Sequence, residues 1–182
     1  MQQHSPFAEH LADTGLRDCF DFWLSRRQGQ RPPDKRAIDA TRIPRAIIPN
    51  LFLYELTAEN RFKCRLAGSA IREAFGREPT GHFLDELVDP ASTSDRTALF
   101  RATLDRQLPV VYGGRIAEGE KRWISFKRLL LPVNDDRGSS RFVFGMVMFV
   151  SNDEANDRRF NTASSTYRFE SWATEADIAI SQ

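Results

Sequence analysis

The sequence has few of the residues that build metal centres or disulfide frameworks. Its 182 residues include two cysteines, Cys19 and Cys64, and three histidines, His4, His10 and His82. The cysteines do not form a Cys-x-x-Cys pair, which favours two small buried apolar residues over a disulfide or redox pair. No histidine has a second ligand at metal-binding spacing, so the sequence predicts no metal site.

The chain also has no long apolar run. No window approaches the roughly 18 apolar residues that a membrane-spanning helix requires. The N-terminal stretch MQQHSPFAEHLADTG lacks the basic and apolar regions of a signal peptide. A net charge of +1 gives no general attraction to nucleic acid or to an anionic membrane. We therefore expect a cytoplasmic protein with no membrane partner.

Recognisable catalytic motifs are missing as well. The chain has no Gly-x-Ser-x-Gly elbow, no Walker-type phosphate loop and no dinucleotide-binding glycine motif after a strand. The acidic group Asp85, Glu86 and Asp89 contains candidate general bases. A small enzyme or carrier with a cone-shaped α+β fold, using Asp85 or Asp89 as base, is therefore an alternative. A solvated, acidic helix start explains the same residues, and we predict a protein that is not an enzyme and has no catalytic residue.

The most informative stretch is residues 61–90, RFKCRLAGSAIREAFGREPTGHFLDELVDP. Phe62, Cys64 and Leu66 alternate with basic residues, which predicts a strand with one apolar face. Ile71 and Phe75 then lie four apart, as on one side of a helix, and FLDEL gives one more helical turn. A strand followed by two such short helices suits the wall of a pocket better than a rigid core.

An amphipathic helix is predicted before this stretch, over residues 16–28. Leu16, Cys19, Phe20, Trp23 and Leu24 follow the i, i+3, i+4, i+7, i+8 spacing of one helical face. So much apolar area on one stripe must be buried against the sheet or against a partner. Further strands are predicted at residues 50–57, 110–116, 121–133 and 141–150, and a longer helix at residues 94–107.

This order of elements resembles a PAS domain. The residues that carry the resemblance are the run LAGSAIREAFGREPTGHFLDEL, the upstream IPRAIIPNLFLYEL and the downstream RWISFKRLLLPV, within about residues 16–150. The chain is most similar to the bacterial single-domain proteins of the PAS_5 type. The resemblance implies an α+β fold, with a five-stranded antiparallel sheet, short helices on one face and the N-terminal amphipathic helix on the other. We expect a flexible N-terminus at residues 1–14, the PAS-like domain at 15–151 and a polar C-terminal tail at 152–182.

The resemblance also bears on cofactors. In PAS domains that bind haem, the histidine ligand typically lies on the longer helix, but here residues 94–107 contain no histidine. His82 instead follows Gly81 in a predicted turn. Flavin photochemistry in the family needs a reactive cysteine just after the second strand, where this chain has Gly68, Ser69 and Ala70. Neither haem nor flavin is expected, and the cofactor stays unassigned.

The function that the resemblance implies is sensory or regulatory, through small-ligand binding, protein–protein interaction or both. The predicted pocket lies between the short helices and the inner sheet face and contains Leu66, Ile71, Phe75, Phe83, Leu87, Phe100, Phe126 and Phe144. A filled core explains these apolar residues equally well. Arg65, Arg115 and Arg128, on predicted strands, would meet an anionic ligand if they point inward.

The predicted partner contact is the stripe Leu16, Phe20, Trp23 and Leu24. It would form a homodimer or bind a partner signalling protein. Basic residues and aromatics also alternate in the segments RFKCR and KRWISFKR. Binding of nucleic acid by these segments is a lesser alternative, which the near-zero net charge disfavours.

Overall fold

The structure is a computed structural model that describes residues 6–12, 14–118, 122–150 and 165–179. The helices are α1 (Pro6–His10), α2 (Thr14–Ser25), α3 (Ser69–Phe75), α4 (Leu84–Leu87), α5 (Pro90–Arg106) and α6 (Glu175–Ile178). The strands are β1 (Leu51–Leu56), β2 (Phe62–Ala67), β3 (Val110–Glu118), β4 (Arg122–Asn134), β5 (Ser140–Val150) and β6 (Ser165–Trp172). Short 3-10 turns lie at Lys35–Ala37, Ala40–Arg42 and Ile48–Asn50.

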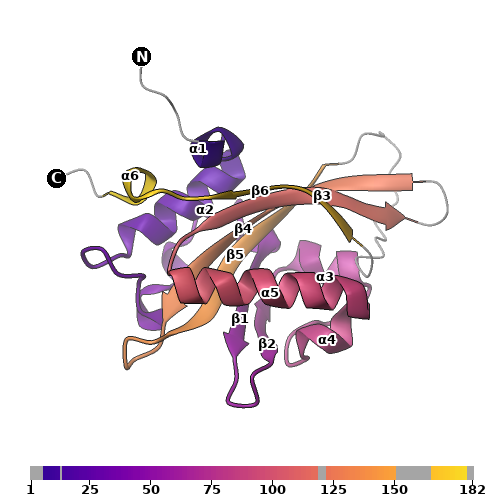
Figure 1. Ribbon diagram of the computed structural model, residues 1–182, viewed down its shortest axis with the longest axis horizontal. Helices are drawn as coiled ribbons and strands as arrows, with labels where there is room; N and C mark the ends of the chain where they lie inside the picture. The colour runs from indigo at the N-terminus through magenta and orange to yellow at the C-terminus, as the bar shows by residue number, and fades with distance from the viewer. Residues whose placement is uncertain (1–5, 13, 119–121, 151–164, 180–182) are drawn as a thin grey trace.

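The strands form one antiparallel sheet in the order β2-β1-β5-β4-β3-β6 (Figure 1). The PAS-like α+β fold is confirmed, with six strands where five were predicted. The additional strand is β6, which comes from the predicted tail and pairs with β3 from Ile116↔Ser165 to Val110↔Trp172. An edge strand is held largely by main-chain hydrogen bonds, which leave little trace in side-chain periodicity.

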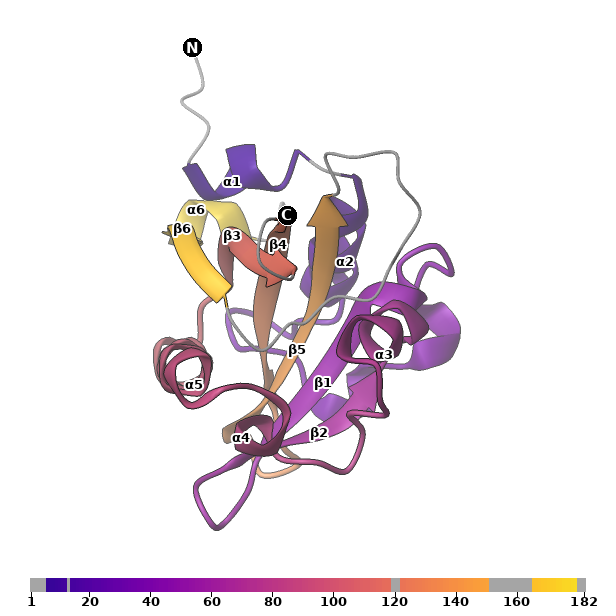
Figure 2. The same cartoon turned by 90° about the vertical axis from the view of Figure 1, so that its right-hand side faces the viewer.

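Helices cover both faces of the sheet (Figure 2). On one face, α1, α2 and α6 pack against apolar side chains of β3, β4 and β5. On the other face, α3, α4 and α5 pack against a second apolar cluster that includes residues of β1 and β2. The prediction that short helices and the N-terminal amphipathic helix lie on opposite faces is confirmed.

The apolar stripe of α2 is buried by this chain itself. Leu16, Phe20 and Trp23 are each at most 2% exposed, and Leu24 is half-buried. The Trp23 indole N–H donates a hydrogen bond to the carbonyl oxygen of Pro132 over 2.8 Å. The prediction of the stripe as a partner contact is corrected on this point: three of its four residues belong to the core. The doubly apolar β5 requires cover on both faces, and within one chain α2 covers one face and α5 the other.

The packed unit also extends past the predicted domain at both ends. Phe7 and Leu11 are at most 1% exposed, although residues 1–14 were expected to be flexible. At the other end Ile178 joins the same apolar cluster. Its carbonyl oxygen accepts a hydrogen bond from the buried Arg27 guanidinium. Residues 151–164 of the predicted tail lie outside the described residues.

A bulge in β2 decides which side chains face the short helices. Leu53 pairs with Leu66 and Tyr54 with Cys64, so Arg65 is an extra residue in the ladder. An extra residue reverses the alternation of side chains beyond it. Cys64 therefore faces the helices, whereas Leu66 is 41% exposed.

Candidate functional site

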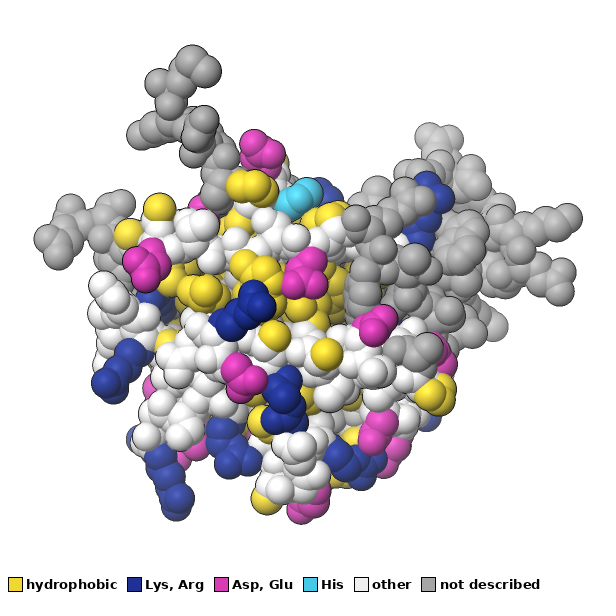
Figure 3. Space-filling view, in the orientation of Figure 1, with side chains coloured by type: hydrophobic (Ala, Val, Ile, Leu, Met, Phe, Trp, Pro, Cys, Tyr) yellow, Lys and Arg dark blue, Asp and Glu magenta, His cyan; other side chains and the backbone are white. Residues whose placement is uncertain are grey.

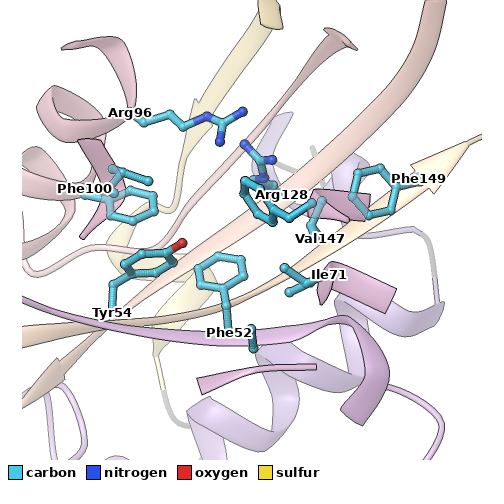
Figure 4. Close-up of a pocket in the computed structure, with 11 residues that line it drawn as sticks. Phe52, Tyr54, Ile71, Arg96, Phe100, Arg128, Val147 and Phe149 are labelled. Carbon is cyan, nitrogen blue, oxygen red and sulfur yellow. The ribbon is translucent and has the colours of Figure 1, made fainter. Parts of the chain in front are cut away.

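A pocket lies between the sheet and the helices α3, α4 and α5 (Figure 4). It contains about 440 Å³ of empty space, counted out to its opening to solvent. Nine of the residues that line it are apolar or aromatic and two are arginines. They are Phe52, Tyr54, Ala67, Ile71, Phe75, Leu84, Arg96, Phe100, Arg128, Val147 and Phe149. A largely apolar concavity with few polar groups is typical of small-molecule sites.

Phe100 on α5 organises the aromatic wall of the pocket. Its ring is parallel to that of Phe52, with centroids 6.3 Å apart. The rings of Tyr54 and Phe62 meet it edge-on, each with its centroid 5.3 Å away. These offset and edge-to-face geometries are favourable for aromatic pairs. They fix this wall by contacts between β1, β2 and α5.

Arg128 brings a charge to the sheet side of the pocket. It shares a face of β4 with Phe126 and Leu130, and it is 6% exposed. Its guanidinium carbon lies 4.8 Å from the centre of the Phe126 ring. Its Nη1 donates to the Tyr112 hydroxyl over 3.3 Å. Aromatic stacking and this hydrogen bond orient the guanidinium.

Arg96 brings a second charge from the helix side. It lies one turn before Phe100 on α5, so the two side chains share the inner face of that helix. Arg96 is 2% exposed. The guanidinium groups of Arg96 and Arg128 point toward one another in Figure 4, and the Tyr54 hydroxyl points into the same space. Burial raises the pKa of this hydroxyl, so Tyr54 is neutral.

The predicted pocket residues are only partly brought together. Ile71, Phe75 and Phe100 line the pocket. Leu87 and Phe126 are buried in the apolar cluster on the same face but are not part of the lining.

Phe83 lies apart from the lining. Its half-buried ring packs under the cationic ends of Arg61 and Lys63, 3.7 Å and 5.4 Å from the ring centre.

The prediction was wrong for two pocket residues, because neither Leu66 nor Phe144 faces the pocket. Leu66 follows the β2 bulge and points away, and Ala67 takes its place in the lining. Phe144 belongs to the opposite apolar cluster, where its ring meets Phe22 of α2 at a centroid distance of 6.2 Å. Both sets of alternating residues on β5 are apolar, so the sequence did not reveal which set faced the short helices.

The sequence analysis missed Arg96 and did not choose among the strand arginines. Arg128 is the buried one, whereas Arg65 forms an exposed ion pair with Glu55 at 2.6 Å and Arg115 is half-buried. The alternation of Arg128 with Phe126 and Leu130 was a usable signal for its inward position. For Arg96 the signal was its spacing of four residues from Phe100.

The carboxylates of the enzyme alternative have structural roles. Asp85 lies at the surface in an ion pair with Arg61 at 2.7 Å, and the hydrogen bond from Arg61 lowers the pKa of this carboxyl. Asp89 caps α5 by accepting a hydrogen bond from the Ser92 backbone N–H over 3.0 Å. A general base requires a desolvated carboxylate with a raised pKa, which Asp85 lacks. The helix predicted at residues 94–107 began too late to include this cap, because α5 begins at Pro90.

Other kinds of site find little support in the described ranges. Within them, no three His, Cys, Asp or Glu residues lie close enough to hold a metal ion. His82 is at the surface beside Glu86. Phe62 and Phe126, the aromatics proposed for nucleic-acid stacking, are buried in the core, and the side chain of Trp123 is outside the described set. Acidic and basic side chains are interspersed on the face in Figure 3.

An antiparallel sheet with short helices and an apolar pocket on one face defines a PAS-type α+β domain. The chain matches the PAS domain family PAS_5 over residues 11–148, and it belongs to that family. No curated protein matches the chain. The family match ends at residue 148, so β6 and α6 lie outside the matched region. Over the part of the chain that the structure describes, no helix is both long and apolar enough to cross a membrane.

Proposed function

We propose that this protein is a non-catalytic sensory or regulatory module that binds a small molecule in the pocket between α3, α4, α5 and the sheet. The observation that carries the proposal is the pocket itself, in which two buried arginines and a tyrosine hydroxyl interrupt an otherwise apolar wall. A few oriented polar groups in an apolar concavity provide specificity for a ligand. Membership of the PAS domain family supports a sensory role.

The signal would leave the pocket through α5. Arg96 and Phe100 of this helix line the pocket. Near its end, Arg106 lies over the ring of Trp172 on β6, with its guanidinium carbon 4.3 Å from the ring centre. A ligand that favours one position of α5 would therefore also bias the β6 edge of the sheet. A partner signalling protein or a second copy of the chain would read that edge, and the cytoplasm is the predicted compartment.

Native mass spectrometry of protein purified from its own host tests this function. We expect a small-molecule adduct that is lost after denaturation and refolding. Ala67→Leu places a larger side chain in the pocket lining and should abolish the adduct. Ala102→Leu, on α5 but outside the lining, is the matched control and should retain it. Wild-type protein that always has the mass of its chain alone would contradict the proposal, and an absorbance spectrum of the same sample detects a coloured cofactor.

A further inference from the structure

We propose that the pocket takes a small, electrically neutral ligand with an aromatic ring, which is held by ring contacts and not by a charge. This inference rests on the proposed function, since it names the class of ligand for the same pocket. Its central observation is a division within the lining: aromatic rings surround the open space, whereas the polar groups beside it interact with other parts of the chain (Figure 4).

The polar groups of the lining already have partners within the protein. The Tyr54 hydroxyl donates a hydrogen bond to the Cys64 sulfur. The Arg128 guanidinium donates to the Tyr112 hydroxyl over 3.3 Å, and Arg96 also interacts within the chain. A ligand group that used these side chains would have to displace interactions that the folded protein already makes.

A charged ligand group is disfavoured for this reason. An ion that leaves water for a poorly solvated site is stable there only with a counter-charge. The lining contains no acidic residue, so a cation would meet only the like charges of Arg96 and Arg128. An anion would compete with the existing partners of these two arginines. A neutral ligand avoids both costs.

Aromatic rings make up much of the remaining wall. Ring pairs in offset and edge-to-face arrangements attract one another by more than their buried area alone provides. Phe100 already makes both kinds of contact with its neighbours in the wall, and a ligand ring would extend this set. Five of the eleven lining residues carry a ring, namely Phe52, Tyr54, Phe75, Phe100 and Phe149.

Two of these rings are less covered than the others and mark the mouth of the pocket. Phe75 at the end of α3 and Phe149 near the end of β5 are half-buried, whereas Phe52 and Phe100 are at most 4% exposed. A ligand ring beside Phe75 and Phe149 would remove apolar surface from water. An apolar cavity of about 150 Å³ already accepts benzene. The space of about 440 Å³ here, counted out to the solvent, therefore suits a ligand of one or two rings.

Isothermal titration calorimetry on the wild-type full chain is the first test. The probes are 2-phenylethanol, the phenylacetate anion, the 2-phenylethylammonium cation and 2-cyclohexylethanol, which lacks the aromatic ring. We expect 2-phenylethanol to bind with a dissociation constant below about 1 mM. It should bind at least about tenfold more tightly than either ion, and at least about twofold more tightly than 2-cyclohexylethanol. Equal or tighter binding of any of these three, or no binding of 2-phenylethanol, would overturn the inference.

Variants then test the two rings at the mouth. Phe75→Leu and Phe149→Leu keep an apolar side chain and remove a ring. Each should weaken binding of 2-phenylethanol at least about twofold and leave that of 2-cyclohexylethanol unchanged. Phe83→Leu, which replaces a half-buried ring outside the lining, is the matched control and should bind both probes like wild type.

Unchanged affinity for 2-phenylethanol in both folded variants would contradict the ring contacts. Circular dichroism establishes that each variant is folded, and if one is not, the comparison of probes on wild-type protein decides. Native mass spectrometry separates this inference from the function on which it rests. An adduct identified as an ion would overturn the neutral aromatic class and leave the proposed function standing, whereas the absence of any adduct together with no probe binding would contradict both.

Discussion

Single residues carry much of the packing between α2 and the sheet, and Trp23 contributes most clearly. Its side chain is fully buried, and its ring stacks on that of Phe20 with centroids 6.1 Å apart. Its indole N–H donates a hydrogen bond to the carbonyl oxygen of Pro132. A residue with this set of contacts stabilises the domain whether or not the protein associates.

We expect Trp23→Ala to lower the free energy of unfolding by about 3–5 kcal/mol, since it leaves a large cavity. Trp23→Phe should cost about 1–3 kcal/mol, because the buried Pro132 carbonyl loses its donor. Asp21→Ala, exposed on the same helix, should change stability by less than about 0.5 kcal/mol. Denaturant unfolding measures all three, and an unchanged midpoint for Trp23→Ala would refute the core role.

A second prediction at the residue scale concerns the reactivity of the two thiols. Burial raises the pKa of Cys64 from its ordinary 9.0 to about 11 and raises the pKa of Cys19 as well. Neither thiol should react with a disulfide reagent at pH 8 in the folded protein, and both should react in denaturant. The raised pKa values also mean that their contribution to stability is full below pH 9 and declines as the pH rises toward 11. Rapid labelling of the native protein would show that a thiol is accessible.

At the scale of elements, the terminal segments are joined to one another as well as to the sheet. The His10 imidazole of α1 stacks on the Phe169 ring of β6, with centroids 4.1 Å apart. Arg27, just after α2, donates to the Ile178 carbonyl at the end of α6. Three helices and an edge strand therefore stabilise each other's position on this face.

His10 should make this arrangement sensitive to acid. Burial and the nearby charge of Lys127 lower the pKa of His10 below 6.5, so the folded protein favours the neutral ring. The associated stability is present above pH 6.5 and is lost as the pH falls through the lower folded pKa. NMR titration should give a pKa below 6.5 that rises in Lys127→Gln and not in Lys63→Gln. A pKa at or above 6.5 in wild type would contradict the packing of α1 on β6.

Two carboxylates near the start of α5 have different roles. Asp89 caps the helix, and Asp85 lies at the surface. Asp89→Ala removes a helix cap and should lower the free energy of unfolding by about 1 kcal/mol. Asp85→Asn, which affects only an exposed ion pair, should leave stability within experimental error. Chemical denaturation compares the two, and an equal loss in both variants would show that capping is not the role of Asp89.

For the whole molecule, the α2 stripe is buried within its own chain, so a substitution in it should affect folding and not association. A homodimer remains a prediction, but Leu16, Phe20 and Trp23 are covered by their own chain. We therefore expect Trp23→Phe to lower stability and to leave the mass measured by light scattering equal to that of the wild type. Dissociation of a wild-type dimer by this substitution, without loss of stability, would place the interface back on α2.

Several features followed from local pattern. The stripe of α2, the strand before Gly68 and the short helices after it all lie where their periodicity predicted. The antiparallel neighbours β3, β4 and β5 are confirmed too. Period and turn chemistry are properties of consecutive residues, so the order of elements and the PAS-like class were available from the sequence.

The composition of the site depended on contacts between distant segments. The bulge at Arg65 turned Leu66 outward, β5 presented Val147 rather than Phe144 to the pocket, and β6 paired with β3 from far along the chain. The sequence alone determined which segments are helix or strand and that two apolar faces needed cover. Only the tertiary structure decided that Arg96 and Arg128 line the same pocket, because strand register and helix placement are set by non-local packing, which no local period encodes.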